Sequence, residues 1–205
     1  MSLSFKLYLI TDRKAIPDQT LVLEEALNSG VKAVQLREKD LSGRELLHLG
    51  KKIRSLTRNH QAQFFFNERL DLALSTEADG IHCPEEGLPV AQIRERFPKV
   101  AIGKSVHSLR KALEAEKDGA DFVTFSPIFS TPSKEGILEP QGLEQLALVA
   151  SSLKIPVFAL GGITPERAKE CVKHGAHGVA VISAILKSND VPRTVSQFEE
   201  ALGGL

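Results

Sequence analysis

One local pattern recurs along the chain: a helical segment ends at a glycine or at Ala-Asp-Gly, and a short apolar run follows. Glycine suits the left-handed residue that ends a helix. An apolar run of this length is typical of a strand that is buried on both faces. The repeat therefore predicts a helix–strand unit that is used several times. It occurs at Gly30–Val34, Ala78–Ile81, Gly119–Val123 and Gly175–Val179.

Eight apolar runs are candidate strands, and a helical pattern follows each of them. Between the second and third of these runs, helical spacing is shown by Leu46, Leu49, Ile53 and Leu56. Later helices have recognisable starts, with Ser108 as an N-cap and Thr164 as an N-cap before Pro165. The candidate strands are Phe5–Ile10, Ala33–Leu36, Gln63–Phe66, Gly80–His82, Ala101–Gly103, Phe122–Phe125, Pro156–Leu160 and Gly178–Ile182.

Strands that alternate with helices across short loops predict a parallel sheet. Eight such units in 205 residues favour closure into a (β/α)8 TIM barrel, an α/β fold formed by residues 1–205 as a single domain. The alternative is a doubly wound open sheet. No Gly-x-Gly-x-x-Gly follows the first strand, so the dinucleotide-binding form of that sheet is not favoured.

Composition narrows the ligand and the location. Apolar residues make up 42% of the chain, and 26 basic residues balance 26 acidic ones. Without a basic run, neither nucleic acid nor a membrane surface is an expected partner, and an anionic ligand needs local positive charge. No signal-peptide pattern or membrane-spanning apolar run is present, so we expect a cytoplasmic location. Cys83 and Cys171 fit no metal or redox spacing and are expected to be buried thiols.

Polar residues follow the strands, where a barrel of this kind has its active site. Strand ends turn polar where they reach solvent, but so many polar residues on one rim are more than this effect alone predicts. Among them, His82 and His107 could transfer a proton or only hold a loop, and no Ser/His/Asp triad is present. The other rim residues are Gln35, Arg37, Lys39, Asn67, Glu68, Lys104, Ser105, Ser126, Thr131, Ser133, Lys134, Gly161, Gly162 and Ser183.

Two of these groups predict phosphate binding. Gly161 and Gly162 let backbone N–H groups approach a ligand, and Ser183 can begin a short helix after the last strand. The alternative is that the two glycines only make a tight turn.

The segment Gln35-x-Arg37-x-Lys39 is the second group, because alternation puts its three side chains on one side. Two cations and an amide can hold a diphosphate, with Arg bidentate. The alternative is surface charge paired with Glu38 and Asp40.

The loop from Ser126 to Gly136 is long for a connector and is predicted to act as a lid. Its hydroxyls and Lys134 could fold over a leaving diphosphate.

Taken together, these residues resemble the thiamine phosphate synthase family and its relatives, the TenI-type thiazole tautomerases, over nearly the whole chain. The stretches that carry the resemblance are Gln35–Lys39, Asn67–Leu74, Ala78–His82, Ile102–Ser108, Ser126–Lys134, Gln141–Gly142, Ala159–Thr164 and Val181–Ile185.

The resemblance implies a TIM barrel in thiamine biosynthesis that joins hydroxymethylpyrimidine diphosphate to thiazole phosphate and releases pyrophosphate. Such chemistry needs charge stabilisation on the leaving group, which cations and Mg²⁺ supply. By similarity, the catalytic residues are Lys134, Arg37, Ser105 and His107. The implied substrate-binding residues are Gln35, Arg37, Lys39, Asn67, Ser105, Thr131, Ser133 and Lys134 for the pyrimidine diphosphate, with Gly161, Gly162, Ile182 and Ser183 for the thiazole phosphate.

The chain departs from the family pattern at the metal ligands. Family synthases usually carry Asp after the Asn at position 67, where this chain has Glu68. A second metal-binding Asp falls where this chain reads Glu85-Glu86-Gly87, and the family's Gly before the loop proline is Ser126. Glu68 keeps the charge, Glu85 or Glu86 can substitute for the second Asp, and Glu68 and Glu86 are the predicted Mg²⁺ ligands.

Three functions remain open from the sequence. The first is a synthase-type transferase that acts on phosphorylated pyrimidine and thiazole substrates. The second is a metal-independent thiazole tautomerase using His107 or His82; Ser105–Ser108 resembles that branch, although Pro127 occupies the place of its catalytic His. The third is a non-catalytic barrel that binds phosphate ligands. A homo-oligomer is expected by analogy with similar barrels.

Overall fold

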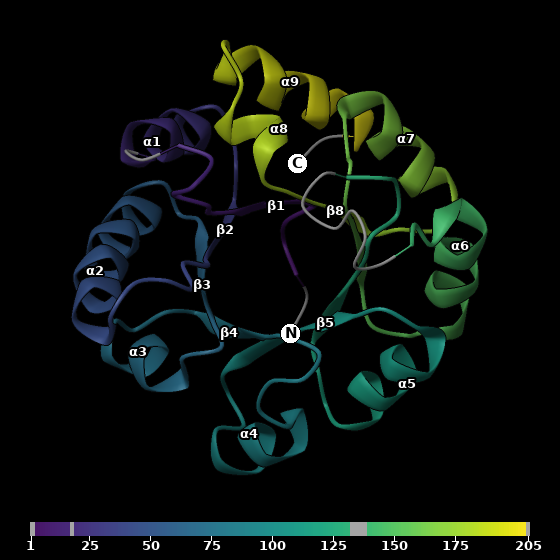
Figure 1. Cartoon of the computed structure of the whole chain (residues 1–205), viewed down its shortest axis with the longest axis horizontal. Helices are drawn as coiled ribbons and strands as arrows, with labels where there is room; N and C mark the ends of the chain where they lie inside the picture. The colour runs from purple at the N-terminus through teal and green to yellow at the C-terminus, as the bar shows by residue number, and fades with distance from the viewer. Residues whose placement is uncertain (1–2, 17–18, 132–138, 204–205) are drawn as a thin grey trace.

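The computed structural model describes residues 3–16, 19–131 and 139–203, and these form a closed ring of eight parallel strands inside a ring of helices (Figure 1). The strands pair in chain order, and β1 pairs with β8 to close the barrel, with Tyr8 opposite Ala180. The prediction of a (β/α)8 barrel is confirmed. The strands are β1 Leu7–Ile10, β2 Ala33–Leu36, β3 Gln63–Asn67, β4 Gly80–Cys83, β5 Ala101–Val106, β6 Phe122–Phe125, β7 Val157–Leu160 and β8 Gly178–Val181.

Over the described ranges, one helix lies between each pair of consecutive strands, two more follow the last strand, and the helices surround the barrel (Figure 1). Their starts follow from local sequence, because Ser108 and Thr164 accept the backbone N–H groups of Lys111 and Arg167 as predicted. The helices are α1 Thr20–Asn28, α2 Gly43–Asn59, α3 Leu70–Ser75, α4 Val90–Arg96, α5 Leu109–Lys117, α6 Gly142–Ser152, α7 Pro165–Lys173, α8 Ser183–Leu186 and α9 Val191–Ala201.

The Asp of the repeated Ala-Asp-Gly and Gly-Ala-Asp segments has a structural role. Asp79 accepts the backbone N–H of Phe64 at 2.8 Å and pairs with Arg54 on α2 at 2.7 Å. Asp121 repeats the arrangement two units later, accepting the N–H of Ile102 at 2.7 Å and pairing with Arg94. Each aspartate ties the preceding strand to a helix of the outer ring, which explains why the motif recurs.

The interior of the barrel is filled by aromatic rings beneath the end where the site lies. Phe5, Tyr8, Phe65, Phe122 and Phe158 are fully buried, and their ring centroids are 5.1 to 6.2 Å apart. Offset-stacked and edge-to-face packing at such distances is favourable. This layer, the aromatic plug, closes the barrel below and leaves the carboxyl ends of the strands open to a ligand.

Candidate active site

A pocket of about 510 Å³ lies at the carboxyl ends of the strands, and every strand contributes to its wall. Ligand pockets are commonly of this size. The structure brings eleven of the predicted substrate-binding and catalytic residues together here, while Ser133 and Lys134 lie outside the described residues. The eleven are Gln35, Arg37, Lys39, Asn67, Ser105, His107, Thr131, Gly161, Gly162, Ile182 and Ser183.

The Gln35-x-Arg37-x-Lys39 segment faces the pocket along one side, as the alternation predicts. Glu38, in contrast, is buried on the other side, where it accepts bonds from the backbone of Arg13 and the amide of Gln19. Asp40 pairs with Arg13 at 2.7 Å. The acidic neighbours are thus engaged elsewhere, so the alternative of local charge pairing is wrong for Arg37 and Lys39.

The floor of the pocket is formed by His82, Ser105 and Thr124 on adjacent strands. His82 Nε2 lies 3.0 Å from Ser105 Oγ, and its ring lies 5.7 Å from the ring of Phe122. Burial lowers the pKa of His82 to about 3, with smaller contributions from the positive charges of Arg37 and Lys104. The ring is therefore neutral at physiological pH, which argues against His82 as the proton-transferring histidine.

The turn after β7 is shaped by two glycines with positive φ, 104° at Gly161 and 65° at Gly162. Added Cβ atoms would lie 2.8 Å from Pro127 and 2.7 Å from the carbonyl oxygen of Ser130, so only glycine fits. Within the described residues, no acceptor is found for the backbone N–H groups of Gly162 and Ile163. Such N–H groups can hold an anion. The short helix α8 starts at Ser183 beside this turn, as predicted.

Acidic residues line the opposite side of the pocket. Glu85 and Glu86 follow β4, and Glu85 Oε2 accepts the backbone N–H of His107 at 2.7 Å. Glu68 is not among the lining residues and has a φ of 64°, a left-handed conformation that is uncommon for a non-glycine residue. No cluster of three or more His, Cys, Asp or Glu suited to a metal occurs in the described parts of the chain.

These carboxylates suit a Mg²⁺ site only if oxygen atoms of the substrate complete the set of ligands. Mg²⁺ is usually bound by one or two carboxylates with phosphates and waters, rather than by an all-protein cage. Glu86 and Glu85 face the same cavity as Arg37 and Lys39, which suits that donor set. The assignment of Glu68 as a ligand stays a prediction.

Two basic residues of the rim make contacts that the sequence did not predict. Lys104 is nearly buried and is not among the residues that line the pocket; its Nζ donates to the carbonyl of Pro84 at 2.7 Å, and burial lowers its pKa. It thus supports the loop that carries Glu85. His107 Nδ1 lies 2.6 Å from the carbonyl oxygen of Ser126. Because a carbonyl only accepts, Nδ1 carries a proton and donates it to this oxygen.

Sequence reasoning missed two polar residues that line the pocket, Thr124 and Asp12. Thr124 is a hydroxyl inside the otherwise apolar strand Phe122–Phe125, and that contrast was the available signal. Asp12 comes two residues after β1, and its place just beyond a strand end was the available signal.

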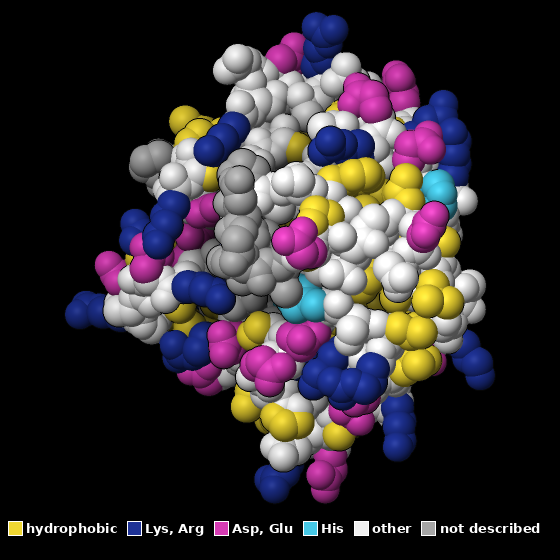
Figure 2. All heavy atoms as spheres, turned by 45° about the vertical axis from the view of Figure 1, so that its right-hand side comes forward, with side chains coloured by type: hydrophobic (Ala, Val, Ile, Leu, Met, Phe, Trp, Pro, Cys, Tyr) yellow, Lys and Arg dark blue, Asp and Glu magenta, His cyan; other side chains and the backbone are white. Residues whose placement is uncertain are grey.

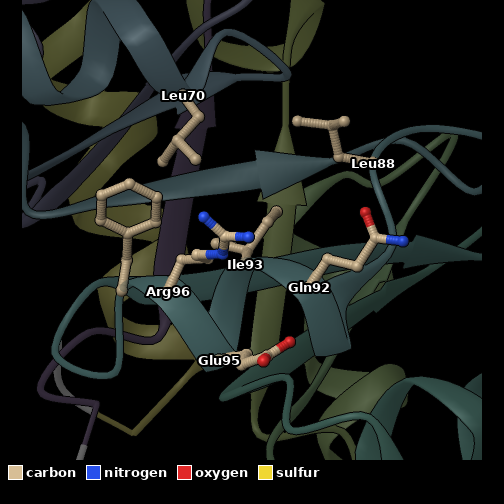
Figure 3. A pocket seen from close by; sticks show the side chains of 7 residues that line it. Leu70, Leu88, Gln92, Ile93, Glu95 and Arg96 are labelled. Carbon is tan, nitrogen blue, oxygen red and sulfur yellow. The ribbon is translucent and has the colours of Figure 1, made fainter.

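Figure 2 shows basic and acidic side chains interspersed around one face, in keeping with the balanced charge. A second hollow lies on α4, where Leu70 and Leu88 point into the space above Ile93 (Figure 3). It shares no lining residue with the pocket at the strand ends. Among the described residues, no helix is both long enough and apolar enough to cross a membrane.

The fold and the site define a class, a (β/α)8 barrel enzyme with a polar pocket at the carboxyl ends of its strands. A family model described as thiamine monophosphate synthase matches residues 7–185. The chain belongs to this family, which confirms the resemblance inferred from the sequence and supports a transferase.

Named relatives agree over most of their length. The chain is 43% identical to the thiamine-phosphate synthase of Pyrococcus furiosus over 202 residues, which is 97% of each protein. It is 49% identical over 183 residues to a putative thiamine-phosphate synthase 2 of Aquifex aeolicus, covering 89% of this chain and 98% of the relative. The solved thiamine phosphate pyrophosphorylase from Pyrococcus furiosus superposes with a TM-score of 0.88 at 40% identity, covering 97% of this chain and 95% of that one.

Proposed function

We propose that this protein is a thiamine phosphate synthase, which joins hydroxymethylpyrimidine diphosphate to thiazole phosphate and releases pyrophosphate. The observation that carries the proposal is that two anion-binding elements face one cavity. Arg37 and Lys39 line one side, and the Gly161–Gly162 turn lines another. A reaction between two phosphorylated substrates needs this arrangement, and relatives more than 40% identical carry the synthase name.

In the reaction, the bond between the pyrimidine methylene carbon and the diphosphate oxygen breaks, and its electron pair leaves with the diphosphate. The thiazole nitrogen then supplies the electron pair of the new carbon–nitrogen bond. Arg37 and Lys39 stabilise the charge that develops on the diphosphate. The N–H groups of Gly162 and Ile163 orient the thiazole phosphate, which brings the nitrogen to the reacting carbon. No protein nucleophile is required.

Mg²⁺, when bound, would neutralise part of the diphosphate charge. Glu86 and Glu85 are the residues that would hold it with the substrate. The aromatic plug excludes water from the side of the pocket that faces the barrel interior, because Tyr8, Phe122 and Phe158 fill the barrel beneath. The cytoplasmic location and a homo-oligomeric state remain predictions.

A turnover assay with both substrates, with and without Mg²⁺, tests the proposal. Pyrophosphate release that needs both substrates and the metal supports a synthase. Metal-independent isomerisation of a thiazole carboxylate phosphate would contradict it in favour of a tautomerase, and binding without turnover would favour a non-catalytic barrel. Arg37→Met should lower turnover about a hundredfold or more, since it removes a bidentate contact to the leaving group. Arg44→Met, on the exposed start of α2, is the matched control and should leave turnover unchanged.

A further inference from the structure

Three polar groups on the pocket floor form a closed hydrogen-bonded set. His82 Nε2 lies 3.0 Å from Ser105 Oγ and 3.3 Å from Thr124 Oγ1, and the two hydroxyl oxygens are 3.3 Å apart. His82 and Thr124 are buried, whereas Ser105 is partly exposed toward the cavity. The directions of these bonds decide what Ser105 can offer a ligand.

The surroundings of His82 Nδ1 determine the direction of the hydrogen bond between His82 and Ser105. Nδ1 is buried without a hydrogen-bond partner in the described structure, beside Gly103, where an added Cβ would lie 2.6 Å away. A proton on Nδ1 would leave a buried donor unpaired, whereas a proton on Nε2 leaves only a lone pair there. Unpaired buried N–H groups are rarer than underused acceptors. The neutral ring therefore carries its proton on Nε2 and donates it to Ser105 Oγ.

The direction of the hydrogen bond between Thr124 and Ser105 follows from that of the first bond. Its hydroxyl lies near His82 Nε2 and Ser105 Oγ, and Nε2 is already a donor. The hydrogen of Thr124 is therefore donated to Ser105. A serine hydroxyl has two acceptor lone pairs and one hydrogen. With both lone pairs occupied by His82 and Thr124, the hydrogen of Ser105 is directed into the cavity.

We infer that His82 is a positioning residue, which acts through Ser105 by committing its hydroxyl to donate a hydrogen bond to a ring nitrogen of the pyrimidine substrate. The identity of this ligand rests on the proposed function. The floor suits a flat heteroaromatic ring, because the His82 ring lies 5.8 Å from that of Tyr8 and 5.7 Å from that of Phe122. A C–H or N–H group at the same place would leave the hydroxyl hydrogen of Ser105 without an acceptor. The three side chains therefore favour a ligand atom that has a lone pair at this position.

A double-mutant cycle with His82→Met and Ser105→Ala tests the inference. The probe is hydroxymethylpyrimidine monophosphate, which lacks the diphosphate leaving group, with its affinity measured by calorimetry. Each single variant should bind it about fivefold more weakly, the loss expected for one hydrogen bond. The double variant should bind no more weakly than Ser105→Ala alone, because His82 acts through that hydroxyl. Additive losses of roughly 25-fold would overturn the inference.

Two further variants separate positioning from a structural role. His82→Gln offers an amide N–H in place of Nε2–H and should restore most of the affinity, while thiazole phosphate binding stays unchanged in every variant. Failure of that rescue overturns the inference. His177→Met, which removes a ring packed 5.3 Å from Phe158, should lower stability without changing pyrimidine affinity. Where His82→Met does not fold, Thr124→Val removes the second donor to Ser105 and should weaken binding only when Ser105 is present.

The wild-type protein distinguishes failure of the inference from failure of the proposed function. If the wild-type protein turns over and the losses in the double-mutant cycle are additive, the inference is overturned and the proposed function stands. Absence of pyrophosphate release overturns the proposed function, and the binding cycle still decides the role of His82. Absence of pyrimidine monophosphate binding by a wild-type protein that turns over overturns the inference and leaves the proposed function standing.

Discussion

The guanidinium of Arg167 lies over the ring of Phe129, with its central carbon 4.6 Å from the ring centroid. The same side chain donates from Nη1 to the carbonyl oxygen of Gly162 at 2.6 Å. Phe129 belongs to the loop after β6, and Gly162 belongs to the turn after β7. Arg167 therefore joins the two loops at the proposed thiazole phosphate site, from the first turn of α7.

Replacing Arg167 with Met should loosen this junction. The cation–π contact is worth about 0.5–1 kcal/mol at an exposed position, and the hydrogen bond about 1 kcal/mol. We expect the KM for thiazole phosphate to rise about threefold to tenfold, with little change in the KM for the pyrimidine diphosphate. Steady-state kinetics with each substrate varied in turn measures both. Arg110→Met, at an exposed pair with Glu114 on α5, is the control, and equal rises for both substrates would contradict the role.

Gly162→Ala should damage the same turn more severely. Its Cβ would lie 2.7 Å from the carbonyl oxygen of Ser130, and its φ of 65° is unfavourable for alanine. We expect thiazole phosphate affinity to fall at least tenfold, because the N–H groups of the turn shift. Gly203→Ala separates strain from collision, since Gly203 has a similar φ of 72° and no atom within 4 Å of the added Cβ. Calorimetry measures the affinity, and an affinity for Gly162→Ala like that of Gly203→Ala would rule out the collision argument.

The sequence predicted the barrel because its signals were local and repeated. All eight strands lie where the apolar runs were, and β2 and β6 match their predicted bounds. The boundary errors have a physical cause. β5 continues to Val106, three residues beyond the predicted end, because the polar residues Lys104 and Ser105 still pair with β6. Polar residues indicate where a strand reaches the pocket, but they do not indicate where strand pairing ends.

Most of the site was also predictable, since residues that follow parallel strands converge at one end of a barrel. What the sequence could not supply was side-chain direction within the strands. Lys104 and Ser105 are adjacent, yet Ser105 faces the pocket and Lys104 donates to the carbonyl of Pro84. The sequence does not single out Thr124, because a threonine in an apolar strand is common and its partners come from two other strands.

The pairing of β8 with β1 closes the barrel, and the stability of this seam should be sensitive to a single added methyl group. An added Cβ on Gly178, at the start of β8, would lie 2.1 Å from the carbonyl oxygen of Lys6, just before β1. Gly178→Ala should therefore lower the free energy of unfolding by about 3 kcal/mol or more, because neither backbone can move without breaking strand pairing. Urea denaturation measures the change. Gly43→Ala at the start of α2, where the nearest atom is 3.4 Å away, should be neutral or slightly stabilising. Equal stability of the two variants would contradict close packing at the seam.

The two cysteines should be unreactive while the protein is folded. Both side chains are fully buried, and burial raises the pKa of Cys83 to about 11 and that of Cys171 to about 12. Because the thiolate is the reactive form, iodoacetamide at pH 8 should modify neither residue in the native protein over hours, and should modify both in concentrated urea. Mass spectrometry counts the labels, and Cys171→Ser reports Cys83 alone. Rapid labelling of native Cys171→Ser would show that Cys83, at the end of β4 next to Pro84, becomes accessible without global unfolding, and would contradict a rigid wall on that side of the pocket.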